Sequence, residues 1–435
     1  MGVNRNTMKI LLEAPILTQS GYGTHSRLVF DSLRGKGLDI YVSALEWGKT
    51  SWNIDLLTDQ ELRSSIIKYG SYMEACRQEN KQPQFDVQIR VGIANEFEKK
   101  AKYSVLVTAG IETDRVSAEW LMRTHRGIDK IVVPSNHAKL GFSETYYEVS
   151  NNMTQQKTHL ACASDIDVVP YPVVDHDSVE VDLDIDTKFN FLSIALLGHR
   201  KNIENSIIWF LEEFRDDPDV GLIIKTGMGK NSLLDRESTR KMLRSVRSAH
   251  KDSKCKVYLL HGSMSNDEIH SLINHEKVHA YYSTTHGEGY GLPIFEAAYS
   301  GLPVIVTDWS AHLDFMSAPF KESGKIRDKK LFAKIDYDLR EVDEHAVWEP
   351  LIIKGSKWAY PRASSAKHQL RKMYKNYGMY KKWASVLKEQ ILKTHNRDLI
   401  INKMFESLIP ESMRSLPSQE QVDSEIESMF SSLSG

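Results

Sequence analysis

The chain is 435 residues long, which is enough for two or three domains with a sizeable core. Hydrophobic residues make up 41% and charged residues 26%, the balance of an ordinary soluble globular protein, and the formal net charge is only −2. No apolar run approaches the roughly 20 residues that cross a bilayer, and residues 1–6 lack both a secretory and a myristoylation pattern. Cys76, Cys162 and Cys255 are widely spaced and fit no metal or redox pattern, so a cytoplasmic location is expected.

The predicted elements begin with an apolar strand at residues 8–12, followed by a glycine-containing turn at residues 20–25. The turn leads into a helical pattern at residues 28–33 that stops at Gly35. A turn that opens a helix exposes backbone N–H groups that can face a phosphate, and a purely structural turn is the alternative. The candidate contacts in this turn are Gly21, Tyr22 and Gly23.

An acidic stretch follows at residues 175–186, where six acidic residues alternate near the end with Val, Leu and Ile. We interpret it as the crossing between two domains, with a solvated edge of period two. A metal-binding Asp-x-Asp pattern is the alternative, but the stretch follows no strand-end pattern.

The second half of the chain opens with a predicted strand at residues 191–195, the first of a second Rossmann-like unit. The turn Gly198-His199-Arg200-Lys201-Asn202 follows, and a helix is predicted over residues 207–211. Arg200 and Lys201 suit a nucleotide diphosphate, because fixed cations stabilise the negative charge that builds on a leaving phosphate. A solvated Arg-Lys turn is the alternative.

The densest motif is residues 286–303, which lie between predicted buried strands at residues 277–282 and 303–307. Its glycine-rich turn opens a helix, whose free N–H groups can bind phosphate and sugar oxygens. Glu288 lies in the turn and Glu296 eight positions later, on a similar helical face, so one pocket can use both. An ordinary strand-to-helix turn is the alternative.

This motif resembles the hallmark of the retaining family 4 glycosyltransferases, Glu-x7-Glu within Glu-Gly-(Phe/Tyr)-Gly-Leu-Pro, followed by Glu-Ala and Gly-x-Pro-Val. Residues 111–120, 131–135 and 358–361 also resemble segments that recur in the family. The resemblance therefore extends along most of the chain.

The resemblance implies a role for each motif residue. Glu288 contacts the donor sugar, and Glu296 binds the ribose hydroxyls. Lys201 matches the family's lysine, whereas the family's arginine stands several residues earlier, so Arg200 is a substitute for it. The turn at residues 21–23 approaches the donor diphosphate and the acceptor from the other domain. The backbone that contacts sugar and phosphate belongs to Gly289, Tyr290, Gly291 and Leu292.

The expected fold class is α/β, with two Rossmann-like domains facing across a cleft (GT-B) and C-terminal helices returning to the first domain. We expect residues 1–180 to form the N-terminal, acceptor-side domain and residues 188–365 the C-terminal, nucleotide-sugar-binding domain. Residues 366–435 then form the returning helices, with a mobile tail from Ser415 that is rich in Ser and Glu.

The implied reaction is retaining transfer of a hexosyl or pentosyl group from a nucleotide-diphosphate-sugar to a hydroxyl acceptor. Attack occurs on the same face through an oxocarbenium-like state, and the leaving diphosphate helps to take the acceptor proton. We expect no cofactor and no metal ion, because Arg200, Lys201 and backbone N–H groups take the charge. Four histidines flank the motifs, and a lone histidine is more often structural than catalytic: His25, His137, His199 and His286.

Two basic segments bear on the acceptor. Residues 225–256 hold ten lysines and arginines against three acidic residues, and residues 367–397 hold nine against one. Duplex DNA with a hydroxymethylated base, an anionic membrane carrying a lipid-linked sugar and a small glycan are the candidate acceptors, and solvated helix faces are the plain alternative. Some phage enzymes glycosylate modified bases in DNA with the same architecture, so a phage-type member is among the readings. The basic positions at helical spacing are Arg236, Arg240, Arg244, Arg247 and Lys251.

Other classes of protein remain open. A nucleotide-sugar epimerase or a sugar phosphorylase can share the fold, although the chain shows no pyridoxal-lysine context. A binding protein without catalysis is also possible, but the presence of Glu288, Glu296 and Lys201 argues against it. An NAD-dependent dehydrogenase fits poorly, because no Gly-x-Gly-x-x-Gly follows the first strand.

Overall fold

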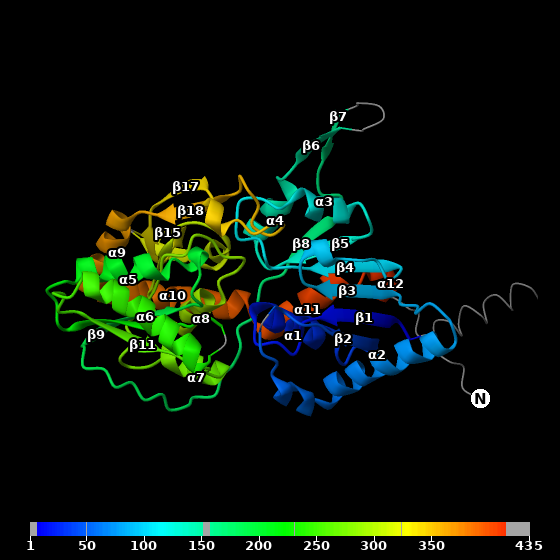
Figure 1. Cartoon of the computed structure of the whole chain (residues 1–435), viewed down its shortest axis with the longest axis horizontal. Coiled ribbons are helices and arrows are strands. Elements are labelled where there is room, and N and C mark those ends of the chain that lie inside the picture. The colour runs from blue at the N-terminus through cyan, green and yellow to red at the C-terminus, as the bar shows by residue number, and fades with distance from the viewer. Residues whose placement is uncertain (1–6, 49, 151–156, 230, 323, 415–435) are drawn as a thin grey trace, which may run out of the picture.

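The computed structural model of the chain describes residues 7–48, 50–150, 157–229, 231–322 and 324–414. The tail from Ser415, predicted to be mobile, lies outside these residues. Figure 1 shows two α/β halves, each built around its own sheet. The expected fold class of two Rossmann-like domains is therefore confirmed.

The first domain contains a parallel sheet of six strands, whose central strands are buried because apolar residues fill both faces. Its helices are α1 (Gly21–Leu33), α2 (Gln60–Gln78), α3 (Ala118–Thr124) and α4 (Asn136–Ser143). A hairpin of β6 (Tyr147–Ser150) and β7 (Lys157–Leu160) extends from this domain. The sheet strands, in spatial order, are β2 (Asp39–Ala44), β1 (Lys9–Ala14), β3 (Val87–Val91), β4 (Tyr103–Val107), β5 (Lys130–Val133) and β8 (Asp165–Val168).

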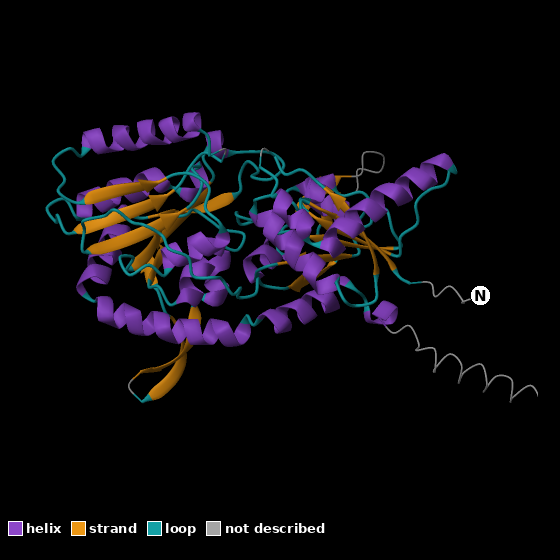
Figure 2. Ribbon diagram, turned by 90° about the horizontal axis from the view of Figure 1, so that it is seen from below, coloured by secondary structure: helices purple, strands orange, loops and turns teal. Residues whose placement is uncertain are grey.

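The second domain repeats the plan with another parallel sheet of six strands, and Figure 2 shows helices against both sheets. Its helices are α5 (Ile203–Glu213), α6 (Leu233–Ala249), α7 (Asn266–Ile273), α8 (Leu292–Ser300) and α9 (Ala363–Lys375). The sheet strands, in spatial order, are β11 (Lys256–Leu260), β10 (Val220–Lys225), β9 (Phe189–Ile194), β12 (Ala280–Ser283), β13 (Val304–Thr307) and β16 (Ala333–Ile335). Two antiparallel pairs are added, β14 (Ser317–Glu322) with β15 (Lys325–Lys330) and β17 (Tyr337–Glu341) with β18 (Lys357–Pro361).

The order in which successive strands are added to the sheet reverses at one place in each domain, and these places position the site. In the first sheet the reversal lies between β1 and β3, and in the second between β9 and β12. Ligands of open α/β sheets bind outside the carboxyl ends of the strands at such a reversal. The turns after β9 and β12 are the ones that carry Arg200, Lys201 and Glu288.

The C-terminal end of the chain returns to the first domain, as expected, but the first two helices of the predicted segment 366–435 pack on the second domain, α9 on α5 and the next helix on α8. Helix α10 (Tyr377–Thr394) packs on α8, and α11 (Arg397–Leu408) packs on α1, followed by α12 (Glu411–Arg414). Ile400, Met404 and Leu408 of α11 belong to the same hydrophobic core as Leu28 of α1. Among the described helices, none is long and apolar enough to cross a bilayer.

The acidic crossing at residues 175–186 alternates in burial, as predicted, but it contains no strand. Leu183 is buried whereas Asp182 and Asp184 are exposed. The segment lies along α7, where the backbone N–H of Val179 donates to the Ser271 hydroxyl, 3.0 Å away. Side-chain contacts with one helix replace the strand pairing that the period-two pattern suggested.

Candidate functional site

A cavity of about 1400 Å³ is lined by loops of both domains at the carboxyl ends of the two sheets. Its walls include the turns after β1 and β4 in the first domain and after β9, β10 and β12 in the second. Nine predicted site residues line it: Gly21, Tyr22, Arg200, Lys201, Glu288, Gly289, Tyr290, Gly291 and Leu292. The structure therefore brings the two predicted glycine turns together on one cavity.

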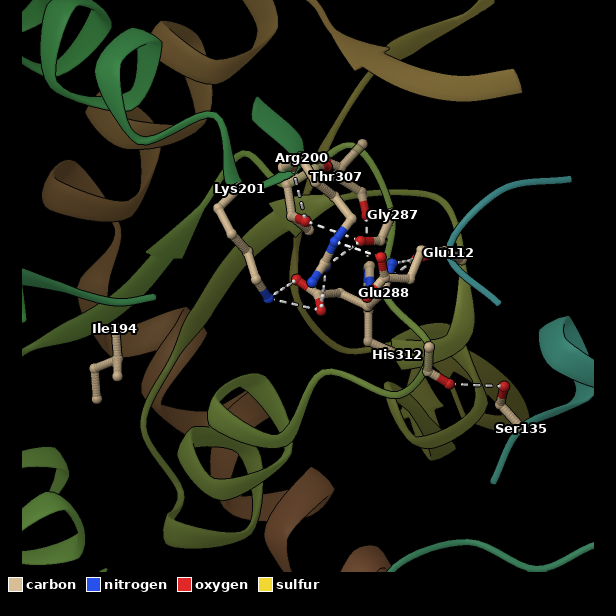
Figure 3. A network of polar contacts seen from close by, with 12 residues as sticks. Glu112, Ser135, Ile194, Arg200, Lys201, Gly287, Glu288, Thr307 and His312 are labelled. Carbon is tan, nitrogen blue, oxygen red and sulfur yellow. Dashed lines mark hydrogen bonds and ion pairs between the residues drawn. The ribbon is translucent and has the colours of Figure 1, made fainter. Parts of the chain in front are cut away.

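Glu288 is the centre of a charged network in this cavity (Figure 3). The Lys201 ammonium donates to its two carboxylate oxygens, at 2.6 and 2.8 Å. The Arg200 guanidinium donates to Glu288 Oε2 at 2.9 Å and to the Gly287 carbonyl at 2.7 Å. Two cations thus converge on one carboxylate that is only 5% exposed.

Local backbone geometry explains how these side chains meet. Asn202 adopts a left-handed conformation, φ 53°, between the turn that holds Lys201 and helix α5. Gly291 is also left-handed, φ 92°, where the chain enters α8. The N–H groups of the first turn of α8 have no carbonyl partner within the helix, and Leu292 at its start lines the cavity. The backbone N–H of Glu288 itself donates to the Ser310 hydroxyl, at 2.9 Å.

The electrostatic environment keeps Glu288 ionised. Burial opposes its charge, but Lys201 and Arg200 outweigh burial and lower the pKa of Glu288 to about 2. Burial and the neighbouring Arg200 lower the pKa of the Lys201 ammonium below its usual value, despite the attraction of Glu288. Burial disfavours the charge of Arg200 as well, but Glu112 and Glu288 raise its pKa. The network holds two positive and two negative groups in a site largely withdrawn from water.

Glu112 supplies the second carboxylate, and it comes from the first domain. Its Oε2 lies 2.8 Å from Arg200 Nε, so the ion pair joins the two domains across the cavity. Burial raises the pKa of Glu112, and the charge of Glu288 acts in the same direction. The sequence placed Glu112 in a family-like segment without giving it a role. Its position just beyond β4, at the carboxyl end of a buried strand, was the available signal.

The glycines of the motif serve close approach between the domains. A Cβ atom on Gly289 would lie 1.7 Å from the Ala109 carbonyl oxygen, and one on Gly287 would lie 2.1 Å from that of Glu112. The Ser135 hydroxyl donates to the Gly289 carbonyl at 3.1 Å, which fastens the same contact. Only glycine permits this approach, so the motif shapes the domain interface as well as the donor side of the cavity.

Two predicted site residues lie elsewhere. Gly23 does not line the cavity. A Cβ on it would meet the Thr18 carbonyl oxygen at 2.1 Å, so this glycine permits the first turn of α1 to pack against the preceding loop. Glu296 faces His270, with Glu296 Oε1 3.5 Å from His270 Nδ1, and is also outside the cavity lining. The expected common face fails because α8 begins only at Leu292, after a non-helical turn, so helical phase cannot be counted from Glu288.

The flanking histidines are mostly structural. His25 is fully buried against Tyr171, and burial lowers its pKa to about 3. His286 Nδ1 lies 2.8 Å from the Ala359 carbonyl, and burial lowers the pKa of His137 to about 4. His199 lines the cavity and packs against His345.

One group with metal-binding residue types exists among the described residues, away from the cavity. His176, His270 and Glu296 offer ligand atoms within 4.8 Å of one another. The two imidazoles are stacked, with ring centroids 4.8 Å apart and planes at 26°. Stacked rings point their nitrogen lone pairs along parallel planes, which is a poor arrangement for one shared ion. We therefore describe the group as a contact between the interdomain segment and the second domain.

The two basic segments behave differently. In the C-terminal segment, Lys367 pairs with Glu212 at 2.9 Å, and Arg371 pairs with Glu213 and Asp217 at 2.6 and 2.8 Å. Helix α6 begins at the cavity, since Leu234 and Ser238 line it, and its Arg236 and Arg244 are exposed. Arg247 instead donates to the carbonyls of Ser253 and Cys255. Among the described residues none beyond Trp358 lines the cavity, so the C-terminal basic segment contributes no residue to it.

Comparison with known proteins finds a family match for one part of the chain. Residues 178–318 match the model of a family described as glycosyl transferases group 1. No curated protein matches the chain in sequence. The matched residues lie mostly in the second domain, so this part of the chain is similar to the glycosyl transferases group 1.

Solved structures share the two-domain fold. Sucrose-phosphate synthase from Thermosynechococcus elongatus matches with a TM-score of 0.56 at 11% identity, over 91% of this chain and 97% of that one. Anabaena HepE in complex with UDP and glucose matches with a TM-score of 0.55 at 11% identity, over 92% and 99%. The pneumococcal O-GlcNAc transferase GtfA matches with a TM-score of 0.45 at 15% identity over 74% of this chain, which spans only 56% of the length of GtfA. The architecture is GT-B.

Proposed function

We propose that the protein is a retaining glycosyltransferase of the family 4 type, which transfers a sugar from a nucleotide-diphosphate-sugar to a hydroxyl acceptor. The observation that carries the proposal is the convergence of Arg200 and Lys201 on Glu288 in the cavity between the domains. HepE, which shares the fold, is described in complex with UDP and glucose, and this supports a nucleotide-sugar donor here.

The charges suggest how the donor binds. Arg200 and Lys201 are balanced by Glu288 and Glu112 before any ligand enters. A diphosphate that takes up the two cations releases the Glu288 carboxylate to accept hydrogen bonds from sugar hydroxyls. The same cations then stabilise the charge that develops on the leaving diphosphate. In this scheme the diphosphate helps to take the acceptor proton, and no protein side chain acts as the nucleophile.

The first experiment identifies the donor and the stereochemistry. Thermal shifts with UDP, GDP, ADP and their sugars should single out one base, because a ligand at 100 times its Kd adds about 2.7 kcal/mol of stability. NMR of the product formed from that donor should show the anomeric configuration of the donor sugar. A product of inverted configuration contradicts the retaining proposal, and isomerisation of the donor alone points to an epimerase.

Calorimetry and transfer assays on two variants distinguish the roles of Glu288 and Glu296. Glu288→Ala should impair transfer, because the contact with the sugar is lost, and should not weaken binding of free nucleotide, because Arg200 and Lys201 are no longer paired with this carboxylate. Glu296→Ala should weaken binding of free nucleotide if its carboxylate turns from His270 to the ribose. Unchanged affinity in Glu296→Ala would assign this residue to the His176 and His270 contact alone.

Metal independence is part of the proposal, because Arg200 and Lys201 can supply the positive charge that a bound Mg²⁺ supplies in other enzymes. Transfer should survive EDTA. Loss of transfer in EDTA that is restored by Mg²⁺ contradicts this.

A further inference from the structure

An apolar surface lies beside the mouth of the cavity. Leu196 is 60% exposed, Met228 61%, Leu233 76% and Leu234 81%, and we call these four residues the apolar rim. Three of them, Leu196, Met228 and Leu234, also line the cavity. Water-exposed side chains of this size in one place mark an interaction surface more often than chance exposure.

The apolar rim is one continuous feature. The backbone N–H of Leu197 donates to the Gly227 carbonyl at 2.9 Å, which joins the segments that carry Leu196 and Met228. The backbone N–H of Met228 donates to Asp235 Oδ1 at 2.8 Å, which fastens Met228 to the first turn of α6. Leu233 and Leu234 are the first two residues of that helix.

A basic helix face continues from the rim. Arg236, Lys241 and Arg244 of α6 are exposed, and Arg240 pairs with Glu237 at 3.3 Å. The buried side of the helix is held by Asp235, Thr239 and Val246. Helix α6 therefore presents leucines at the cavity end and cations along its length, the arrangement of a helix that lies at a membrane interface.

We propose that the apolar rim and the exposed face of α6 bind an anionic lipid surface, so that the acceptor reaches the cavity from the membrane. Leucine and methionine side chains enter the region between headgroups and acyl chains, and the arginines and Lys241 neutralise lipid phosphates. Lipid binding itself does not depend on the proposed function. Only the statement that the membrane supplies an acceptor rests on it.

The other occupants fit the surface less well. Phosphates of duplex DNA would neutralise the arginines but would leave four apolar side chains against a polar backbone. A second copy of the chain would bring its own arginines to the same face, and the like charges would repel. An anionic bilayer satisfies the apolar and the basic parts together.

Vesicle flotation tests the proposal without any turnover. The full chain should float with vesicles of phosphatidylcholine and phosphatidylglycerol at low salt, and weakly or not at all with phosphatidylcholine alone. Leu233→Ser with Leu234→Ser should weaken binding by about tenfold or more, because less apolar area enters the lipid. Leu399→Ser, at an exposed leucine of α11, is the matched control and should bind as the wild type does. Circular dichroism confirms that each variant is folded.

A second pair of measurements decides between lipid and nucleic acid. Arg236→Glu with Arg244→Glu should abolish the preference for anionic vesicles. No flotation of the wild type, or equal flotation of the double leucine variant, overturns the proposal. Tight binding of a duplex that the arginine variant abolishes, without vesicle binding, also overturns it and assigns the face to DNA. If the chain binds vesicles but transfers no sugar, the lipid-binding proposal stands and the proposed function is contradicted instead.

Discussion

The two Rossmann-like domains contribute opposite chemistry to one cavity. Each has six parallel strands. The order in which strands are added reverses between β9 and β12 in the second sheet and between β1 and β3 in the first. The turns at the second reversal carry Arg200, Lys201 and Glu288. The turns of the first domain bring aromatic rings and backbone carbonyls, with Tyr22 against Trp47 at a centroid distance of 4.1 Å. The second domain supplies three of the four charged groups, whereas the first adds only Glu112 and mainly shapes and closes the space around them.

The largest expected effect tests the charged side. Lys201→Ala should lower kcat/KM for transfer by about 100-fold, because a fixed cation beside the leaving diphosphate is lost. Lys188→Ala, at an exposed lysine paired with Asp219, is the matched control and should change little. Activity of Lys201→Ala within about twofold of the wild type would remove Lys201 from the site.

The next effect tests how closely the two domains meet. Gly289→Ala places a Cβ atom 1.7 Å from the Ala109 carbonyl oxygen, so the domains must separate or the turn must shift. We expect kcat/KM to fall by about tenfold, since misplaced catalytic groups lose transition-state contacts. Small-angle scattering should show a more open chain. Gly378→Ala on α10, where an added Cβ meets nothing within 4 Å, serves as the control. Equal scattering and activity would show that the turn relaxes without consequence.

A smaller effect is expected for the ion pair that crosses the cavity. Glu112→Gln keeps the size of the side chain but removes the charge that faces Arg200 Nε at 2.8 Å. Arg200, no longer paired with Glu112, should then bind free nucleotide diphosphate several-fold more tightly. The kcat should fall, because the contact between the two domains is weaker. Calorimetry and steady-state kinetics measure the two changes separately. Weaker nucleotide binding would mean that Glu112 positions Arg200 and does not compete for it.

The last prediction is about stability and not activity, and it concerns acid unfolding of the first domain. His25 is buried, and its pKa of about 3 in the folded chain lies below the ordinary value of 6.5. The unfolded chain takes up a proton as the pH falls below 6.5, while the folded chain excludes it down to about 3. The free energy of unfolding therefore decreases through this window, by up to about 1.4 kcal/mol per pH unit for one proton. His25→Phe should flatten that slope in urea titrations, whereas His159→Phe at an exposed site should not. Parallel slopes for all three chains would contradict the assignment.

The sequence predicted the charged side of the site better than the closing side. Arg200, Lys201 and Glu288 lie within short motifs, where a strand, a turn and a helix follow each other, so local pattern was sufficient. Glu112 and Trp47 reach the cavity only through the packing of distant segments, and no local spacing encodes that meeting. For Glu296 the argument from helical phase does not apply, because it was counted from Glu288 across a turn that is not helical, so its role in nucleotide binding stays a prediction.

Fold class was predictable for a similar reason. Apolar runs of strand length that alternate with helical patterns predict parallel sheets, and both six-stranded sheets are parallel. The different strand orders of the two sheets were not predictable, since period and propensity say nothing about which strands become neighbours. The apolar rim was also missed, because Leu233 and Leu234 open an amphipathic helix whose buried face could not be assigned from sequence alone.

The position of α11 has a consequence for how the chain is made. A ribosome completes residues 1–168 of the first domain long before it reaches residues 397–408, yet Ile400, Met404 and Leu408 fill the core beside α1. The surface of α1 that receives them stays open while the entire second domain is synthesised. The core of the first domain is thus sealed only after the second domain has been made, and a nascent chain stalled before α11 would present that apolar surface to chaperones.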